Sequence, residues 1–254
     1  MKNEERFSNR VDSYMNYRPS YPKEAIDYLY NSVGLHSNSK IADVGSGTGI
    51  FSKLLLERGS YVIAVEPNQA MRAAAEQMLE NEPNFQTISG SAESTGLADH
   101  SVEFIVSAQA FHWFDRLAAQ TEFRRILQPG GKVVLIWNSR LTTGNSFRVE
   151  YDQLLHAYGT DYEKVNHKNI SESVLHSFFK EGTMQKANFQ MSQEFDFEGL
   201  KGRLQSSSYS PVPGHPNYTP MMTELQNIFD RNKREGTVLF DYVTEIFWGK
   251  YDQS

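Results

Sequence analysis

The clearest pointer to the fold class is the glycine-rich segment Asp43-Val44-Gly45-Ser46-Gly47-Thr48-Gly49. It continues an apolar run at 41–44 that is typical of a buried strand, and the segment that follows at 50–58 has the spacing of a helix. Glycine permits positive φ and lets the backbone approach a ligand with no Cβ in the way. A glycine loop between a strand and a helix predicts a cofactor site on a parallel α/β sheet.

The alternation of strand and helix patterns continues on both sides of this loop. Apolar runs predict strands at 61–65, 85–89, 102–107 and 132–137, and helical spacing predicts helices at 22–34, 69–80, 117–127, 147–158, 172–179 and 219–229. Apolar and polar residues alternate at 187–197 and 238–248, which is typical of half-exposed antiparallel strands at a sheet edge. The pattern predicts an α/β fold with a mostly parallel seven-stranded sheet covered by helices on both faces.

We expect one domain over residues 1–254, divided into four parts. Residues 1–21 form an N-terminal lid segment, because Pro19 and Pro22 favour an extended path. Residues 22–140 form the cofactor-binding core, and 141–182 insert a small helical cap over the mouth of the sheet. Residues 183–254 complete the sheet.

Composition limits the classes of function. The chain of 254 residues has a formal net charge of −6, whereas binding to a phosphate backbone requires a basic face. It contains no cysteine, which excludes disulfides and cysteine-based zinc sites. No stretch approaches the roughly 18 apolar residues of a membrane span, and the first residues lack a signal core. We expect a cytoplasmic protein with no metal, nucleic-acid or membrane partner.

The loop spacing and a later acid narrow the choice of cofactor. The spacing is G-x-G-x-G, and Ile50 stands where the dinucleotide fingerprint needs a small residue for close packing. Glu66 follows the second strand, where a carboxylate can accept both hydroxyl protons of an adenosine ribose. A nicotinamide-dependent oxidoreductase is therefore disfavoured but stays a competing interpretation.

These residues resemble the class I S-adenosylmethionine-dependent methyltransferases. The acid and glycines of 43–49 match the family's first motif, and Glu66 with Pro67 matches the second. The resemblance continues through Gly90-Ser91-Ala92-Glu93, where the family binds adenine, and through 127–131 before the fifth strand. It implies a Rossmann-like class I methyltransferase fold with strand order 3-2-1-4-5-7-6.

Within the family, the chain is similar to the trans-aconitate methyltransferase-like (methyltransferase type 11) enzymes. Arg6-Phe7, the segment 14–22 and Ala110-Phe111-His112-Trp113-Phe114 carry this likeness, which extends over about residues 5 to 140. After about residue 140 the likeness to these enzymes is weak, and the corresponding part of such enzymes usually selects the substrate.

The resemblance implies S-adenosyl-L-methionine as the cofactor. Many relatives carry an aspartate where this chain has Ser91, so Glu93, the Ser91 hydroxyl or the Ala92 backbone must meet the adenine amino group. Met71 either packs on the adenine or belongs to the core. The cofactor-binding residues are Asp43, Gly45, Ser46, Gly47, Gly49, Glu66, Pro67, Met71, Ser91, Ala92, Glu93 and Gln109.

Methyl transfer from a sulfonium needs alignment more than acid–base chemistry, because the cofactor carries its own leaving group. A carboxylate pressed against the sulfur would stabilise the ground state more than the transition state, so Asp43 belongs near the cofactor's amino group or the loop backbone. His112 is the candidate catalytic residue, as a general base, since imidazole titrates near neutrality. The alternative is that His112 orients Trp113.

We expect the methyl group to pass to a small-molecule acceptor, at a carboxylate or hydroxyl oxygen. The competing interpretations are an inactive cofactor-binding regulatory protein and the oxidoreductase, with a protein or RNA substrate disfavoured by the acidic charge. Arg18 suits a carboxylate of the cofactor or of the substrate. The candidate substrate-binding residues are Tyr14, Tyr17, Arg18, Trp113, Trp137 and Tyr209.

Overall fold

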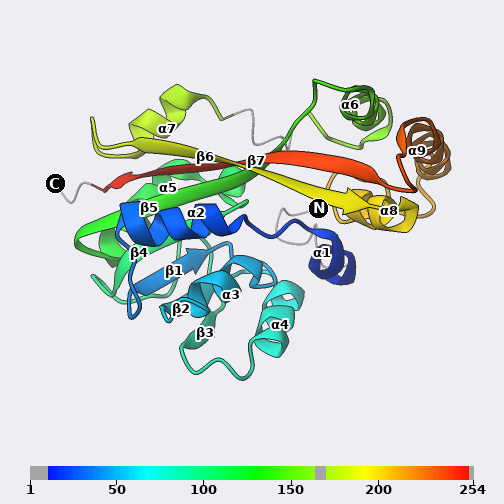
Figure 1. Cartoon of the computed structure of the whole chain (residues 1–254). Coiled ribbons are helices and arrows are strands. Elements are labelled where there is room, and N and C mark those ends of the chain that lie inside the picture. Colours follow the sequence, from blue (N-terminus) through cyan, green and yellow to red (C-terminus); the bar gives the residue numbers. More distant parts are fainter. Residues whose placement is uncertain (1–10, 164–169, 252–254) are drawn as a thin grey trace.

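A computed structural model describes residues 11–163 and 170–251 of the chain. Its centre is a seven-stranded sheet of order β3-β2-β1-β4-β5-β7-β6, in which only the pairs that involve β7 are antiparallel (Figure 1). The strands are β1 (Lys40–Val44), β2 (Tyr61–Val65), β3 (Phe85–Ile88), β4 (Val102–Ala108), β5 (Leu127–Arg140), β6 (Gln185–Phe195) and β7 (Val238–Lys250). The predicted fold class, the strand order and the antiparallel edge are confirmed.

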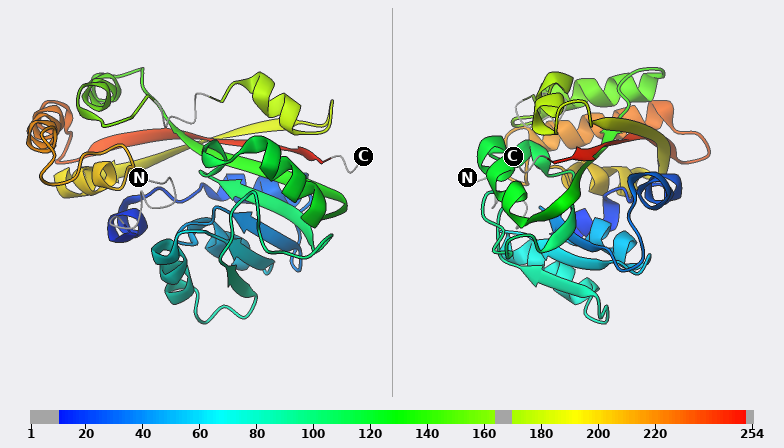
Figure 2. Two further views of the ribbon diagram at one scale, coloured as in Figure 1. Left: turned by 180° about the vertical axis from the view of Figure 1, so that it is seen from behind. Right: turned by 90° about the vertical axis from the view of Figure 1, so that its left-hand side faces the viewer.

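Helices lie on both faces of the sheet and beyond one end of it (Figures 1 and 2). Those of the first half are α1 (Val11–Tyr17), α2 (Lys23–Tyr28) with a π-helical turn at Leu29–Val33, α3 (Ile50–Leu56), α4 (Gln69–Met78), a 3-10 turn at Phe111–Trp113, and α5 (Arg116–Ile126). Those of the second half are α6 (Ser146–Tyr158), α7 (Glu172–Phe178), α8 (Phe197–Gln205) and α9 (Tyr218–Asn232). No helix in the described ranges is both long and apolar enough to cross a membrane.

Successive residues of the parallel strands pack into two different apolar clusters, one on each face of the sheet. On β1, Ile41 packs with α2 and α3, and Ala42 packs with the cluster that contains α5 and α7. On β5, Val134 and Ile136 belong to the cluster with α2 and α3, and Val133 belongs to the cluster with α5 and α7. Because both faces are buried, these strands are apolar throughout rather than alternating.

A third apolar cluster forms a lobe beyond the sheet. The long strands β6 and β7 carry Phe195 and Phe240 past the other strands, where α6, α8 and α9 enclose them (Figures 1 and 2). Tyr151 of α6 is buried edge-on against Phe240, with ring centroids 4.9 Å apart. The lobe therefore stands at the carboxyl end of β5.

Side-chain caps set the beginnings of several helices. The Asn68 side chain accepts the backbone N–H of Met71 at 3.0 Å, as expected at the start of α4. Asp115 begins α5 in the same way, and Asp196 begins α8 by accepting the Gly199 N–H at 2.8 Å. Gly34, with φ of 103°, ends the helical segment that Pro22 precedes.

Three expectations about local structure were wrong. Helix α8 was not predicted, and Phe197, which we had assigned to the alternating strand, is its first residue, because the Asp196 cap ends the strand pattern. Residues 128–131 do not simply close α5: they form an irregular start of β5, where the register to β4 shifts between Val102 and Phe104. Helix α7 is no cap, because Leu175 and Phe178 join the α5 core.

The segment before α2 connects the sheet with the lobe formed by α6, α8 and α9. The Asn138 amide donates to the Ser20 carbonyl at 2.9 Å, and the Tyr21 ring contacts Phe51 edge-on with centroids 4.9 Å apart. Tyr17 lies directly against Gly202 of α8, where an added Cβ would come within 2.3 Å of its ring. The segment thus crosses the carboxyl end of the sheet, which is the position expected of a lid.

Candidate active site

The glycine loop after β1 has the backbone that its sequence predicts. Gly45, Gly47 and Gly49 have φ of 73°, 58° and 81°. A Cβ on Gly45 would lie 2.4 Å from the Ala110 side chain, so close packing excludes a side chain there. A Cβ on Gly47 would meet nothing within 4 Å, so this residue presents bare backbone to open space. That space is where a ligand can approach the loop.

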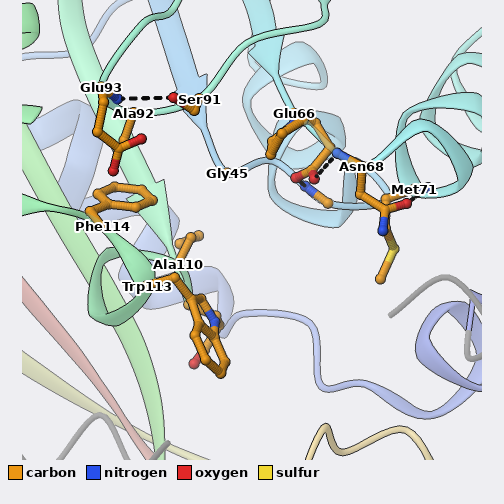
Figure 3. Close-up of a pocket in the computed structure, with 14 residues that line it drawn as sticks. Gly45, Glu66, Asn68, Met71, Ser91, Ala92, Glu93, Ala110, Trp113 and Phe114 are labelled. Carbon is orange, nitrogen blue, oxygen red and sulfur yellow. Dashed lines mark hydrogen bonds between the residues drawn. The ribbon is translucent and has the colours of Figure 1, made fainter. Parts of the chain in front are cut away.

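Glu66 holds the glycine loop from the end of β2. Its Oε2 accepts the Gly47 N–H at 2.9 Å, and its Oε1 accepts the Asn68 N–H at 2.9 Å. The side chain is only 8% exposed, and it faces the pocket beside Gly45 in Figure 3. Each carboxylate oxygen has a second lone pair, so Glu66 can also accept hydroxyl protons from a ligand.

The turn at Ser91–Ser94 closes the pocket on the side of β3. The Glu93 N–H donates to the Ser91 hydroxyl at 3.3 Å, and the Glu93 carboxylate accepts the Asp115 N–H at 2.8 Å (Figure 3). Ala92 between them is buried. All three residues line the pocket, so each of the groups that we expected at this position is present there.

These elements line a pocket that is open to solvent on one side, with about 800 Å³ of empty space when the solvent at its mouth is included. Met71 stands on one side of it, with Trp113 and Phe114 opposite (Figure 3), and Pro67 is also a lining residue. Trp113, which we expected against the substrate, therefore lines the same pocket as Glu66. Phe114, which the sequence assigned either to the core or to a pocket wall, also lines it, and Asn68 is a lining residue that was expected only as a helix cap.

Gln109 connects this pocket with a second, smaller one. It follows β4 and has φ of 63°, an unfavourable backbone conformation for a residue with a side chain. Its N–H donates to the Ile136 carbonyl at 2.9 Å, which holds the strained turn in place, and Gln109 lines both pockets. Strain of this kind is concentrated at functional sites.

Asp43 lies at the floor of the second pocket and is fully buried. Its Oδ2 accepts the Ser52 hydroxyl at 2.6 Å, and its Oδ1 has no hydrogen-bond partner among the described residues. Burial raises the pKa of Asp43 from 3.8 to about 7, the Ser52 hydrogen bond opposes that rise, and the Glu66 charge adds to it. The Asp43 Oδ1, buried and without a hydrogen-bond partner among the described residues, can accept a hydrogen bond from a cationic group of a ligand.

The second pocket brings distant parts of the chain together. Its walls include Ser46 of the glycine loop, Arg18 and Tyr21 of the lid segment, Asn138 of β5 and Arg203 of α8. Arg18 was expected at a site of this kind. Arg203 was not, because its sequence neighbours carry no motif and its helix was not predicted.

Several of the predicted residues line neither pocket, among them Gly49, Tyr17, Trp137 and His112. Trp137 belongs to the core on the α5 face, where its ring packs against Phe111 and Phe247 with centroids 6.1 Å and 5.9 Å away. It is a lining residue of neither pocket. His112 lines neither pocket as well, and its ring packs against Trp113 with centroids 4.7 Å apart.

Tyr209 lies in a cluster of arginine and tyrosine side chains next to the second pocket. Its ring contacts Tyr162 with centroids 4.9 Å apart. Burial raises the pKa of Tyr209, but the charge of Arg203, a hydrogen bond with Ser207, and the charges of Arg18 and Arg140 lower it below its usual value. Tyr14 has its backbone in α1, and its side chain lies outside the described residues.

Comparison with known proteins finds likenesses over part of this arrangement. Residues 42–135, which contain the glycine loop, Glu66 and Gln109, match the family described as a methyltransferase domain. The chain is 40% identical over 134 residues to an uncharacterised methyltransferase of Mycobacterium bovis, an alignment that covers 53% of this chain and 52% of the relative. The chain spans about half the length of the curated relatives that it matches in this way.

Solved structures share the fold over nearly the whole chain. A type II methyltransferase from Anaeromyxobacter dehalogenans superposes with a TM-score of 0.70 at 22% identity and covers 92% of this chain and 98% of its own. Phosphoethanolamine N-methyltransferase 2 of Haemonchus contortus, in complex with S-adenosyl-L-methionine, has a TM-score of 0.56 at 15% identity, over 99% of this chain and 59% of its own. At these identities the likeness concerns the fold alone.

Proposed function

We propose that this chain, a member of the class I S-adenosylmethionine-dependent methyltransferases, transfers a methyl group to a small organic acceptor. The observation that carries the proposal is the open space over Gly47, bordered by the Glu66 carboxylate and the Ala92 turn. Bare backbone, a carboxylate for ribose hydroxyls and an apolar wall together match the parts of an adenosine.

The two connected pockets fit the two ends of S-adenosyl-L-methionine. Glu66 would accept the ribose hydroxyls, with Met71 and Trp113 on either side of the adenosine. The unpartnered Asp43 Oδ1 in the second pocket would accept the cofactor's ammonium group. When bound, the cofactor supplies an electrophilic methyl group and its own leaving group.

The residues around the junction of the pockets would align the acceptor and exclude water. Gln109 stands at this junction with its backbone constrained, so its side chain can be aimed without a cost of ordering at the moment of reaction. Orientation of this kind contributes roughly 7 to 11 kcal/mol in well-aligned systems. No triad of catalytic side chains is needed.

His112 is our candidate for the group that removes a proton from the acceptor. It is on the turn after β4, beside Trp113, and so at the carboxyl end of the strands where ligands of such sheets bind. An acceptor that is already an anion, such as a carboxylate, would not require it. The acceptor oxygen therefore decides whether His112 is catalytic or only orients Trp113.

The test is methyl transfer by the purified chain to a panel of small organic acids and phenols, with labelled S-adenosylmethionine. We expect labelled product from at least one acceptor and none with Gly47→Val. Calorimetric binding of S-adenosylmethionine with no transfer to any acceptor would favour a regulatory cofactor-binding protein. Tight binding of NAD alone would contradict the proposal and favour an oxidoreductase.

A further inference from the structure

Arg203 is a buried cation whose hydrogen-bond partners are all hydroxyl groups. Its side chain on α8 is 6% exposed. The Nε donates to the Tyr242 hydroxyl at 2.9 Å, and Nη1 donates to the Ser207 and Ser206 hydroxyls at 3.0 and 3.4 Å. Within residues 11–163 and 170–251, it takes part in no ion pair, and Nη2 has no hydrogen bond.

The hydroxyl groups accept hydrogen bonds from most of the guanidinium N–H groups, but they carry no negative charge that would balance the cation. Arginine stays protonated in proteins, and a buried charge is normally paired with an opposite one. The rings of Phe240 and Tyr242 lie 5.4 and 5.8 Å from the guanidinium carbon and offer only a weak attraction. Arg203 lines the second pocket, so a ligand in this pocket can balance its positive charge.

Two neighbouring arginines of the same lobe show the contrast. Arg140 pairs with Asp152, and Arg148 pairs with Asp241 at 2.6 Å. Both pairs join elements of the lobe to each other, as structural ion pairs do. Arg203 has no such carboxylate among the residues that the structure describes, so packing of the lobe does not account for its charge.

A second guanidinium group meets Arg203 in the same pocket. Arg18 reaches it from the lid segment, where its Nη2 donates to the Ser206 carbonyl at 3.0 Å. The charges of both arginines act to lower the pKa of Tyr209 and that of Tyr242. Guanidinium groups are the preferred partners of carboxylates, since they present paired donors.

We propose that Arg203, together with Arg18, forms a carboxylate-binding site at the inner end of the second pocket, beside the glycine loop. The carboxylate has two possible sources: the amino-acid end of the cofactor, or the acceptor molecule. The first source is supported by Asp43, whose free Oδ1 in the same pocket would take the ammonium group of an amino acid. The inference rests on the proposed function only for the identity of the cofactor.

The first arm of the test uses the unmodified protein. S-adenosylhomocysteine and its decarboxylated analogue share the adenosine, the thioether and the amine, and differ only in the carboxylate. If the cofactor supplies the carboxylate, calorimetry will show at least about tenfold weaker binding of the analogue. Arg203→Gln will then remove this difference, and Arg203→Lys will restore part of it.

The second arm examines the acceptor as the source. Succinate and citrate are titrated into the protein with and without S-adenosylhomocysteine. If the acceptor supplies the carboxylate, they will bind, Arg203→Gln will weaken that binding at least about tenfold, and the two cofactor analogues will bind equally. Arg148→Gln is the matched control, because it removes an arginine of the same lobe that lies outside the second pocket.

The two failures are distinguishable. Equal binding of the two cofactor analogues by the unmodified protein, with no binding of either organic acid, overturns the carboxylate site without any variant. If Arg203→Gln does not fold, Arg18→Gln on the extended segment carries the same comparisons. Absence of any binding of S-adenosylhomocysteine would overturn the proposed function, and the organic acids would still test the carboxylate site.

Discussion

The Glu66 carboxylate accepts the Gly47 N–H at 2.9 Å, so the end of β2 holds the loop that follows β1. This bond gives Glu66 two tasks, because the same carboxylate that shapes the loop would receive the ribose hydroxyls. A substitution at this residue should therefore affect binding through both the loop conformation and the lost charge.

For Glu66→Gln we expect binding of S-adenosylhomocysteine to weaken about tenfold to a hundredfold, since hydrogen bonds to a charged acceptor contribute roughly 1.5 to 3 kcal/mol. Calorimetry measures the change. Glu57→Gln is the control, because Glu57 is exposed at the end of α3. Equal affinity of the Glu66 variant and the unmodified chain would show that the carboxylate does not contact the ligand.

Gly47→Val should abolish cofactor binding while leaving the fold intact. The new side chain would occupy the open space over the loop. Because Gly47 has φ of 58°, the variant also loses roughly 1 to 3 kcal/mol of stability to backbone strain.

Gly182→Val separates these two effects of the Gly47 substitution. Gly182 has φ of 72° and equally open surroundings, but it lies in the turn before β6. Thermal unfolding should show similar losses of stability for both variants, with cofactor binding retained in the Gly182 variant alone.

The affinity for S-adenosylhomocysteine should rise as pH increases from 6 to 8. Burial raises the pKa of Asp43 to about 7, and only the ionised carboxylate pairs fully with the ligand's ammonium group. The groups that act on the Asp43 carboxyl are the Ser52 hydroxyl and backbone N–H and the Glu66 carboxylate, and two arginines line the same pocket. Calorimetry across this range should give a flat profile for Asp43→Asn.

The same carboxyl group should make the ligand-free fold less stable as pH rises. An acid whose pKa is raised on folding binds its proton more tightly in the folded state, so the folded state loses relative stability from about pH 3.8 up to about 7. Asp43→Asn should therefore gain stability over the unmodified chain across that window and keep the gain above it. A constant difference in unfolding free energy with pH would contradict the raised pKa.

For His112→Ala we expect affinity for S-adenosylhomocysteine within about twofold of the unmodified chain and turnover lowered about a hundredfold or more for hydroxyl acceptors, as removal of a general base predicts. Carboxylate acceptors should be affected little. His36→Ala, at an exposed position, is the control. Weaker cofactor binding with unchanged turnover would instead assign His112 to the orientation of Trp113.

Gly202→Ala should open the lid segment. The added Cβ would come within 2.3 Å of the Tyr17 ring, so Tyr17 must leave α8. We expect faster proteolysis near residue 17 and roughly threefold to tenfold weaker binding of S-adenosylhomocysteine. In a double-mutant cycle with Tyr17→Ala, the two effects should not add, because both variants break one contact.

The parallel core was predictable because its signals are local. Buried strands such as β2 are apolar throughout, Asn68 and Gly34 mark helix ends by their own side chain or backbone, and the spacing of Gly45, Gly47 and Gly49 sets a turn that needs positive φ. Helix α8 was missed because its short sequence has two glycines and follows a strand without a turn signal.

The sheet, the glycine loop and the carboxylate of Glu66 could therefore be predicted from the sequence, because each depends on residues within one strand–loop–helix unit. The place of Trp137 in the core and that of Arg203 at the site depend instead on how distant elements pack. Strand register sets which face receives Trp137, and α8 packs against α1, which brings Arg203 and Arg18 to one pocket. Contacts between residues so distant in the sequence produce no periodic pattern in the sequence, because each of the two residues is placed by the packing of its own element against the other.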